Sequence, residues 1–296
     1  MHDTFSRCHP AVNFLYFTLV LVFSMIFRHP VSLAVSLVCA CAYATLLGGR
    51  SALRFQLRWM LPVILLAAVV NPAFNHYGVT ILAYFPNGNP LTLESILYGL
   101  AAAAMLAAVL MWFYCYNAVV TSDKFVYLFG RLIPALSLVL SMALRFVPRF
   151  KQQFGVVADA QRCLGRDVSS GKLFARLKTA IKIFSIVITW ALENAITTAD
   201  SMRSRGYGEP GRTAFSIYRF DARDRALMLW LGFCGVYVAA GALAHGMSFS
   251  YSPMLRGAPW LPITVSFQVV YLLLCLTPVL MECYSRLVWR KREARA

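Results

Sequence analysis

Long apolar runs separated by short polar segments dominate this chain, and they restrict its fold more than any other feature. Of the 296 residues, 59% are hydrophobic, a share typical of polytopic membrane proteins rather than soluble ones. Within the first 50 residues, Pro30 disfavours one uninterrupted helix and separates two runs. The apolar windows predict six membrane crossings, at residues 11–27, 31–47, 59–74, 94–120, 226–246 and 261–285.

Basic residues are distributed unevenly between these runs. No Lys or Arg lies between Arg58 and Lys124, so we expect the loop at 75–90 to be outside the cell. By contrast, fifteen basic residues lie from Arg145 to Arg225. Because cytoplasmic segments collect Lys and Arg, we expect both termini and residues 121–225 to be cytoplasmic. This topology accounts for the net charge of +16, and since no nucleic-acid-binding motif is present, we expect no nucleic-acid partner.

The resulting fold class is an all-α polytopic membrane protein. It has about six transmembrane helices plus two long amphipathic helices on the cytoplasmic side. We divide the chain into N-terminal transmembrane helices at 1–131, a cytoplasmic helical region at 132–225, and C-terminal transmembrane helices with a basic tail at 226–296.

The two long amphipathic helices are predicted at residues 133–165 and 173–206. In each, apolar residues recur at steps of three and four, the spacing of one helix face. The stripe of the first holds Ala143, Val147, Phe150, Phe154, Val157 and Leu164, and that of the second holds Leu177, Ile181, Phe184, Ile188, Ala191, Ala195 and Met202. Pro148 should kink the first helix. Two roles are open: interfacial helices whose Lys and Arg meet anionic headgroups, or a crossed or paired unit that joins the bundle to a cytoplasmic partner.

The end of the second helix favours the second of these roles, a unit that joins the bundle to a cytoplasmic partner. In Ser204-Arg205-Gly206, the glycine suits the left-handed residue that closes a helix. Arg205 then lies in the last turn, where its guanidinium can make two hydrogen bonds to a carboxylate on a partner. The alternative is a favourable interaction with the helix dipole alone.

Glu193 lies in an apolar stretch of the second helix, where a carboxylate is costly unless it is paired. Arg145 and Arg149 on the first helix are its candidate partners. We interpret this set as a structural ion pair rather than a proton or ion site.

Motifs for chemistry are missing from the sequence. No GxxxxGK[ST] phosphate-binding loop, HExxH or GxSxG occurs. The glycines at 206, 208 and 211 match the dinucleotide-binding spacing but follow a basic helix rather than a strand, so we discard that match. We therefore expect no catalytic residues, no metal site and no cofactor.

Four segments resemble the transmembrane T component of energy-coupling-factor (ECF) transporters, the CbiQ/EcfT family. They are Asn-Pro-x-Phe-Asn-His-x-Gly at 71–78, Arg-Phe-Val-Pro-Arg-Phe at 145–150, Asp-Ala-Gln-Arg at 159–162, and Ser-Arg-Gly at 204–206. The resemblance implies a multi-pass protein of a prokaryotic cell (inner) membrane. In that family two long coupling helices each end in an X-Arg-X motif, and the arginines dock into grooves on two cytoplasmic ABC ATPase subunits. The helices also carry a membrane-embedded substrate-binding S component, which topples during transport.

Carried onto this chain, the second motif is Ser204-Arg205-Gly206. The expected place of the first is Cys163-Leu164-Gly165, where leucine stands instead of arginine and either Arg162 or Arg166 is left to substitute. The resemblance implies a non-catalytic coupling subunit of an importer, with ATP hydrolysed by partner subunits and a vitamin or a transition-metal ion, cobalt among them, as substrate. The alternatives are a membrane scaffold or channel without an ATPase partner, and an integral-membrane lipid enzyme.

Overall fold

The structure is a computed structural model that describes residues 3–75, 78–84, 90–130, 133–166, 173–207, 209, 218–244, 246–251, 254–257, 259 and 261–293. The chain divides into two compact units. Unit 1 comprises Met1–Thr121 together with Tyr218–Ala296, and unit 2 comprises Ser122–Ile217.

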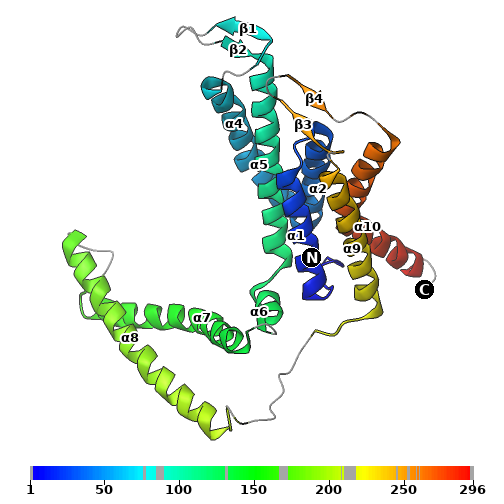
Figure 1. Cartoon of the computed structure of the whole chain (residues 1–296). Helices are drawn as coiled ribbons and strands as arrows, with labels where there is room; N and C mark the ends of the chain where they lie inside the picture. Colours follow the sequence, from blue (N-terminus) through cyan, green and yellow to red (C-terminus); the bar gives the residue numbers. More distant parts are fainter. Residues whose placement is uncertain are drawn as a thin grey trace. The chain divides into compact units, whose positions relative to one another are not determined.

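Unit 1 is a helical bundle whose members are separated by prolines, glycines and two short hairpins (Figure 1). Its helices are α1 (Pro10–Ile26), α2 (Pro30–Gly48), α3 (Arg50–Phe55), a π-helical turn (Gln56–Met60), α4 (Leu61–Phe74), α5 (Leu93–Val119), α9 (Ala222–Leu243) and α10 (Pro262–Glu293). The antiparallel hairpins are β1 (Ile81–Tyr84) with β2 (Pro90–Thr92), and β3 (Phe249–Ser250) with β4 (Arg256–Gly257). The sequence analysis did not predict the hairpins or the π-helical turn.

Prolines start the first two helices. Pro10 and Pro30 occupy the first turn of α1 and α2, where the missing backbone N–H costs nothing. The preceding histidines cap these helices, since Nδ1 of His9 accepts from the amide of Ala11 and Nδ1 of His29 from that of Val31. The predicted interruption at Pro30 is therefore confirmed.

Across the described ranges, five helices contain a stretch long and apolar enough to cross a membrane: Pro30–Gly48, Leu93–Val119, Arg176–Ser204, Ala222–Leu243 and Pro262–Val288. Two shorter apolar helices, Pro10–Ile26 and Leu61–Asn71, lie at the other two predicted crossings. The chain is thus an all-α polytopic membrane protein. The stretch Arg176–Ser204 qualifies by length and composition, although the sequence analysis assigns it to the cytoplasmic side.

Aromatic side chains and buried hydroxyl groups hold unit 1 together. Ser36 Oγ accepts from the indole Nε1 of Trp112 at 3.0 Å and lies 2.7 Å from the hydroxyl of Ser24. Ser24 in turn lies 3.2 Å from the hydroxyl of Tyr271. These contacts join α1, α2, α5 and α10 in a setting where each polar group needs a partner. The phenol of Tyr16, fully buried, donates to the carbonyl of Cys275 at 3.0 Å.

The face of α5 that meets its neighbours is lined by small residues. Gly99, Ala103 and Ala107 recur every four residues and are buried. This spacing lets helices approach closely in lipid, and α5 packs against α1, α2 and α4. Helix α5 is therefore interior to the bundle.

Unit 2 consists of α6 (Ser122–Gly130), α7 (Pro134–Cys163) and α8 (Leu173–Ser204). Within this unit α7 packs on both α6 and α8, and Figure 1 shows the two long helices crossing each other. The predicted bounds of both long helices are confirmed to within two residues. The helix α7 runs from Pro134 to Cys163 with Pro148 inside it. Helix α6 was not predicted.

The crossing uses a different face of α8 from the one the apolar stripe indicated. Ile183 and Val187 are buried against Val157 of α7. By contrast, the stripe residues Ile181 and Phe184 are 61% and 60% exposed. The helix is apolar on more than one side, so the predicted stripe is left as an exposed apolar surface of unit 2.

Candidate functional site

The two long helices of unit 2 end in the same backbone arrangement. Gly165 and Gly206 both have φ of 72°, a left-handed conformation that favours glycine. At the end of α8, Gly206 N–H donates to Arg203 O and Tyr207 N–H donates to Met202 O, each at 3.0 Å. This pair of bonds is the Schellman closure, which satisfies carbonyls that a helix end leaves open.

The end of α7 repeats this closure. Gly165 N–H donates to the carbonyl of Arg162 and Arg166 N–H donates to that of Gln161, each at 3.0 Å. The two ends can therefore be aligned residue by residue through their glycines. Leu164 then takes the place of Arg205, and Cys163 that of Ser204.

This alignment uncovers a short internal repeat. The sequence Ala-Asp-x-x-Arg-x-x-Gly occurs at 158–165 and again at 199–206. The repeat pairs Arg162 with Arg203, a position that the sequence analysis did not single out. Searching the sequence for internal repeats would have found it, because the spacing and residue types are the same at both ends.

The side chains at the end of α8 face solvent. Ser204, Arg205 and Arg203 are exposed, and Ser204 Oγ donates to the carbonyl of Ser201 at 3.0 Å. Within the described ranges the Arg205 side chain makes no hydrogen bond or ion pair. The carboxylate of Glu209 folds back toward Gly206, so that a methyl group added at Gly206 would lie 3.2 Å from it. A guanidinium in this setting is available to an acidic group on another molecule.

The end of α7 offers a different surface. Leu164 is 69% exposed, and Arg162, Cys163 and Arg166 are exposed around it. An exposed leucine flanked by two arginines can be buried only by contact with another surface. The two ends thus share a backbone geometry and differ in the chemistry of the central side chain.

The structure does not bring Glu193 together with the arginines of α7. Glu193 and Arg145 are exposed, and the guanidinium of Arg149 lies over the ring of Trp190, with Cζ 5.7 Å from the ring centroid. Such a cation–π contact contributes about 0.5–1 kcal/mol at exposed sites. Trp190 also meets Phe150 edge-on at 6.0 Å. Arg149 thus rests on an aromatic pair at the helix crossing instead of on a carboxylate.

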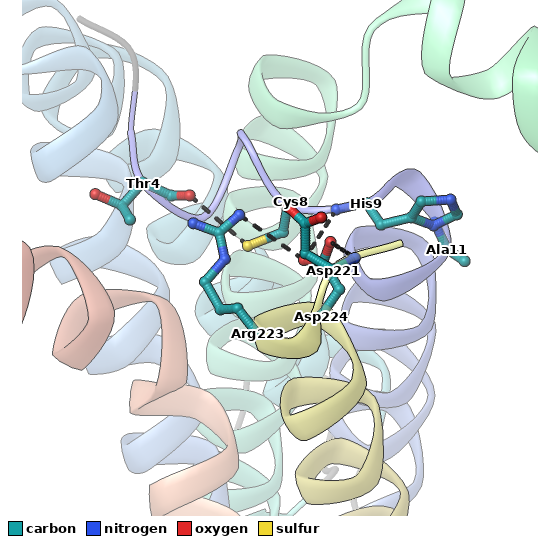
Figure 2. A network of polar contacts seen from close by, with 7 residues as sticks. All are labelled: Thr4, Cys8, His9, Ala11, Asp221, Arg223 and Asp224. Atoms are coloured by element: carbon teal, nitrogen blue, oxygen red, sulfur yellow. Dashed lines mark hydrogen bonds and ion pairs between the residues drawn. The ribbon is translucent and has the colours of Figure 1, made fainter. Parts of the chain in front are cut away.

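A second cluster of polar contacts lies in unit 1, where the N-terminal segment 3–9 meets the start of α9 (Figure 2). Asp224 Oδ1 accepts from the amide of His9 at 3.3 Å, and Oδ2 accepts from the amide of Asp221 at 3.4 Å. Asp221 and Asp224 form a capping box at the first turn of α9. Burial lowers the pKa of His9, against the opposing effect of Asp224.

The same N-terminal segment is tied to α10 and to α2. The amide and hydroxyl of Thr4 both donate to Glu282 Oε2 at 3.0 Å, and Arg286 Nε donates to Glu282 Oε1 at 2.9 Å. The hydroxyl of Tyr43 donates to Asp3 Oδ2 at 2.7 Å. Burial raises the pKa of Asp3 to about 6, and the neighbouring Glu282 carboxylate adds to the shift.

The four segments behind the family resemblance lie in both units. The first, 71–78, begins in the last turn of α4 and continues to Asn75, whose carbonyl accepts from the hydroxyl of Ser95. His76 and Tyr77 lie outside the described residues. The segments 145–150 and 159–162 both belong to α7, and 204–206 closes α8.

A family model described as "Cobalt transport protein", CbiQ, matches residues 3–215. The chain belongs to the CbiQ family. The match covers the first five helices of unit 1 and all three helices of unit 2.

Several curated proteins are similar to this member of the CbiQ family. It is 33% identical over 112 residues to the energy-coupling factor transporter transmembrane protein EcfT of Lacticaseibacillus paracasei, covering 38% of this chain and 40% of that protein. It is 36% identical over 90 residues to EcfT 1 of Listeria monocytogenes, covering 30% and 34%. It is 33% identical over 95 residues to EcfT of Lactococcus lactis subsp. cremoris, covering 32% and 36%. The chain therefore spans less than half the length of these relatives.

Proposed function

We propose that this protein is the transmembrane coupling subunit of an ECF-type ABC importer. Unit 1 forms the membrane bundle, and α7 and α8 are the coupling helices that two cytoplasmic ABC ATPase subunits grip. A membrane-embedded S component binds the substrate. Membership of the CbiQ family and the printed names of the EcfT relatives support this proposal.

The observation that carries the proposal is the repeated closure of the two helix ends. Gly165 and Gly206 give α7 and α8 the same exposed terminus. Two equivalent ends suit two homologous partner subunits. In this arrangement a partner movement applied at the ends tilts both helices, because Ile183 and Val187 pack on Val157 where the helices cross. ATP is hydrolysed by the partners, and this chain transmits the movement.

The two docking points differ in strength. The planar guanidinium of Arg205 makes paired hydrogen bonds to a carboxylate, which the leucine at position 164 cannot do. The first helix end therefore grips its ATPase through Arg162, Arg166 or apolar contact at Leu164. Cys163 and Gly165 supply the backbone of that contact, as Ser204 and Gly206 do at the second end.

The orientation and domain division follow from the charge pattern. Both termini and residues 121–225 are cytoplasmic, the coupling-helix region is 132–225, and 1–131 and 226–296 hold the transmembrane helices. The substrate is a vitamin or a transition-metal ion such as cobalt, chosen by the S component. The name of the family model is what favours a metal ion among these.

The test measures substrate uptake and ATPase copurification in cells that express the chain with its partners. Arg205→Ala should abolish most uptake, since a carboxylate left unpaired in a buried contact costs about 2–5 kcal/mol. Arg205→Lys should rescue poorly because an ammonium lacks the planar fork. Lys182→Ala is the control, because this exposed basic residue lies on the same helix but far from its end. We expect some ATPase to copurify with each variant.

Three results would contradict the proposal. Wild-type uptake by Arg205→Ala would remove the role of that side chain. A loss in Arg162→Ala that equals or exceeds the loss in Arg205→Ala would place the stronger anchor on α7. Absence of any ATPase chain from the purified wild-type complex would favour a scaffold or channel instead.

A further inference from the structure

A groove in unit 1 lies between the first two turns of α9 and the later turns of α10. Its volume is about 570 Å³, within the 300–1,000 Å³ range of small-molecule sites. The lining residues of α9 are at positions 223, 226, 227 and 230, and those of α10 are at 281, 284, 285 and 288. Steps of three and four residues place each set on one helix face. Thr4 of the N-terminal segment lines it as well. The groove is therefore bounded by one face of each of two membrane-spanning helices.

The walls and the rim of the groove differ in chemistry. Leu227, Met281 and Val288 give the walls an apolar surface, and Trp230 is 41% exposed beside them. Arg223 and Tyr284 stand at the rim, and Tyr284 is 72% exposed. An apolar groove whose lining also contains a tryptophan, a tyrosine and an arginine has the composition found where a spanning helix meets lipid headgroups.

The acidic groups near the rim are already engaged. Asp224 is 3% exposed at its side chain and accepts from two backbone amides. Glu282 accepts from Thr4 and from Arg286. The guanidinium of Arg223 approaches Asp224 only to 3.8 Å, and 48% of the Arg223 side chain is exposed. Figure 2 draws both residues at the start of α9. Among the described residues that line the groove, Arg223 is the charged one and no carboxylate is present, so the lining itself is positively charged.

We propose that this groove binds an anionic glycerophospholipid, with an acyl chain along the apolar walls and the phosphate on Arg223. The charge of the rim selects an anionic headgroup. The exposed arginines at the start of α9, Arg223 and Arg225, lie where the positive-inside rule puts the cytoplasmic leaflet. This site goes beyond the coupling function and does not depend on it.

The test is lipid binding by the full-length chain, purified with the subunits that accompany it and titrated with phosphatidylglycerol and phosphatidylcholine under native mass spectrometry. Wild type should prefer phosphatidylglycerol. Arg223→Gln should weaken its binding about fivefold, the factor that corresponds to about 1 kcal/mol for one basic residue near an anionic surface. Ala226→Phe should weaken both lipids by filling the groove. Arg225→Gln is the matched control, an exposed arginine in the same turn that does not line the groove.

The outcomes separate the possible occupants. Equal binding of the two lipids by wild type would overturn headgroup selection. A loss in Arg225→Gln as large as in Arg223→Gln would show diffuse attraction to the basic surface. Undiminished phosphatidylglycerol binding in both Arg223→Gln and Ala226→Phe would place the lipid elsewhere. Exclusion of lipid from the wild-type complex would indicate a protein segment in the groove and would also overturn the proposal. ATPase copurification from the same samples reports on the coupling function separately.

Discussion

Replacing Ile183 with alanine should loosen the crossing of α7 and α8, whereas the same replacement at Ile181 should not. The two residues are identical in type and two positions apart on one helix. Ile183 is fully buried, and Ile181 is 61% exposed. The pair therefore separates the contribution of the crossing from every general effect of shortening an isoleucine in α8.

The magnitude follows from the size of the buried cluster. Truncating a buried isoleucine to alanine costs about 2–5 kcal/mol, depending on how far the surroundings close in. Here the buried cluster consists of Val157, Ile183 and Val187, with Ala158 packed against it. Such a small cluster can collapse easily, so we expect the low end, about 2 kcal/mol. Truncation of the exposed Ile181 should change stability by less than about 0.5 kcal/mol.

Hydrogen exchange of the α8 amides in the purified full-length chain measures this difference. A loss of about 2 kcal/mol in the opening free energy raises exchange through that opening about 30-fold, since 1.4 kcal/mol corresponds to a factor of ten. Ile181→Ala should leave the exchange close to wild type. If Ile181→Ala accelerated exchange as much as Ile183→Ala, the crossing would use the stripe indicated by the sequence, and the structural reasoning would be refuted.

Three further predictions concern other parts of the chain. Asp3→Asn should flatten the pH dependence of the melting temperature. The pKa of Asp3 is raised from 3.8 to about 6, so the folded state has extra stability at low pH that is lost as pH rises through that interval. If the melting temperatures at pH 4.5 and pH 7 differed by as much in Asp3→Asn as in wild type, this prediction would be contradicted. Gly206→Ala and Gly165→Ala should each destabilise the last helical turn by about 1–2 kcal/mol, because both glycines have φ of 72°. Hydrogen exchange of the amides in that turn should be faster in each variant, and an unchanged exchange rate would argue against the left-handed closure. In intact cells, a membrane-impermeant maleimide should label Tyr84→Cys, whereas the exposed Cys163 should react only after permeabilisation; the reverse pattern would invert the topology.

Local sequence patterns were sufficient to predict much of this fold. Apolar runs and Pro30 predicted the order of helices in unit 1, because crossing a membrane demands a run of a given length and proline interrupts a helix at a known place. The bounds of α7 and α8 and the closing residue Gly206 also followed from neighbours in the chain. Each of these features depends on residues within a few positions of each other.

Tertiary structure alone decided which surfaces meet. Helix α8 is apolar on several sides, so periodicity could not distinguish Ile183, which packs on α7, from Ile181, which does not. Likewise, Thr4 and Glu282 are 278 positions apart, and no local pattern pairs them. The groove beside Arg223 has the same origin, because its two walls come from helices that are far apart in the sequence and lie side by side only after the chain folds.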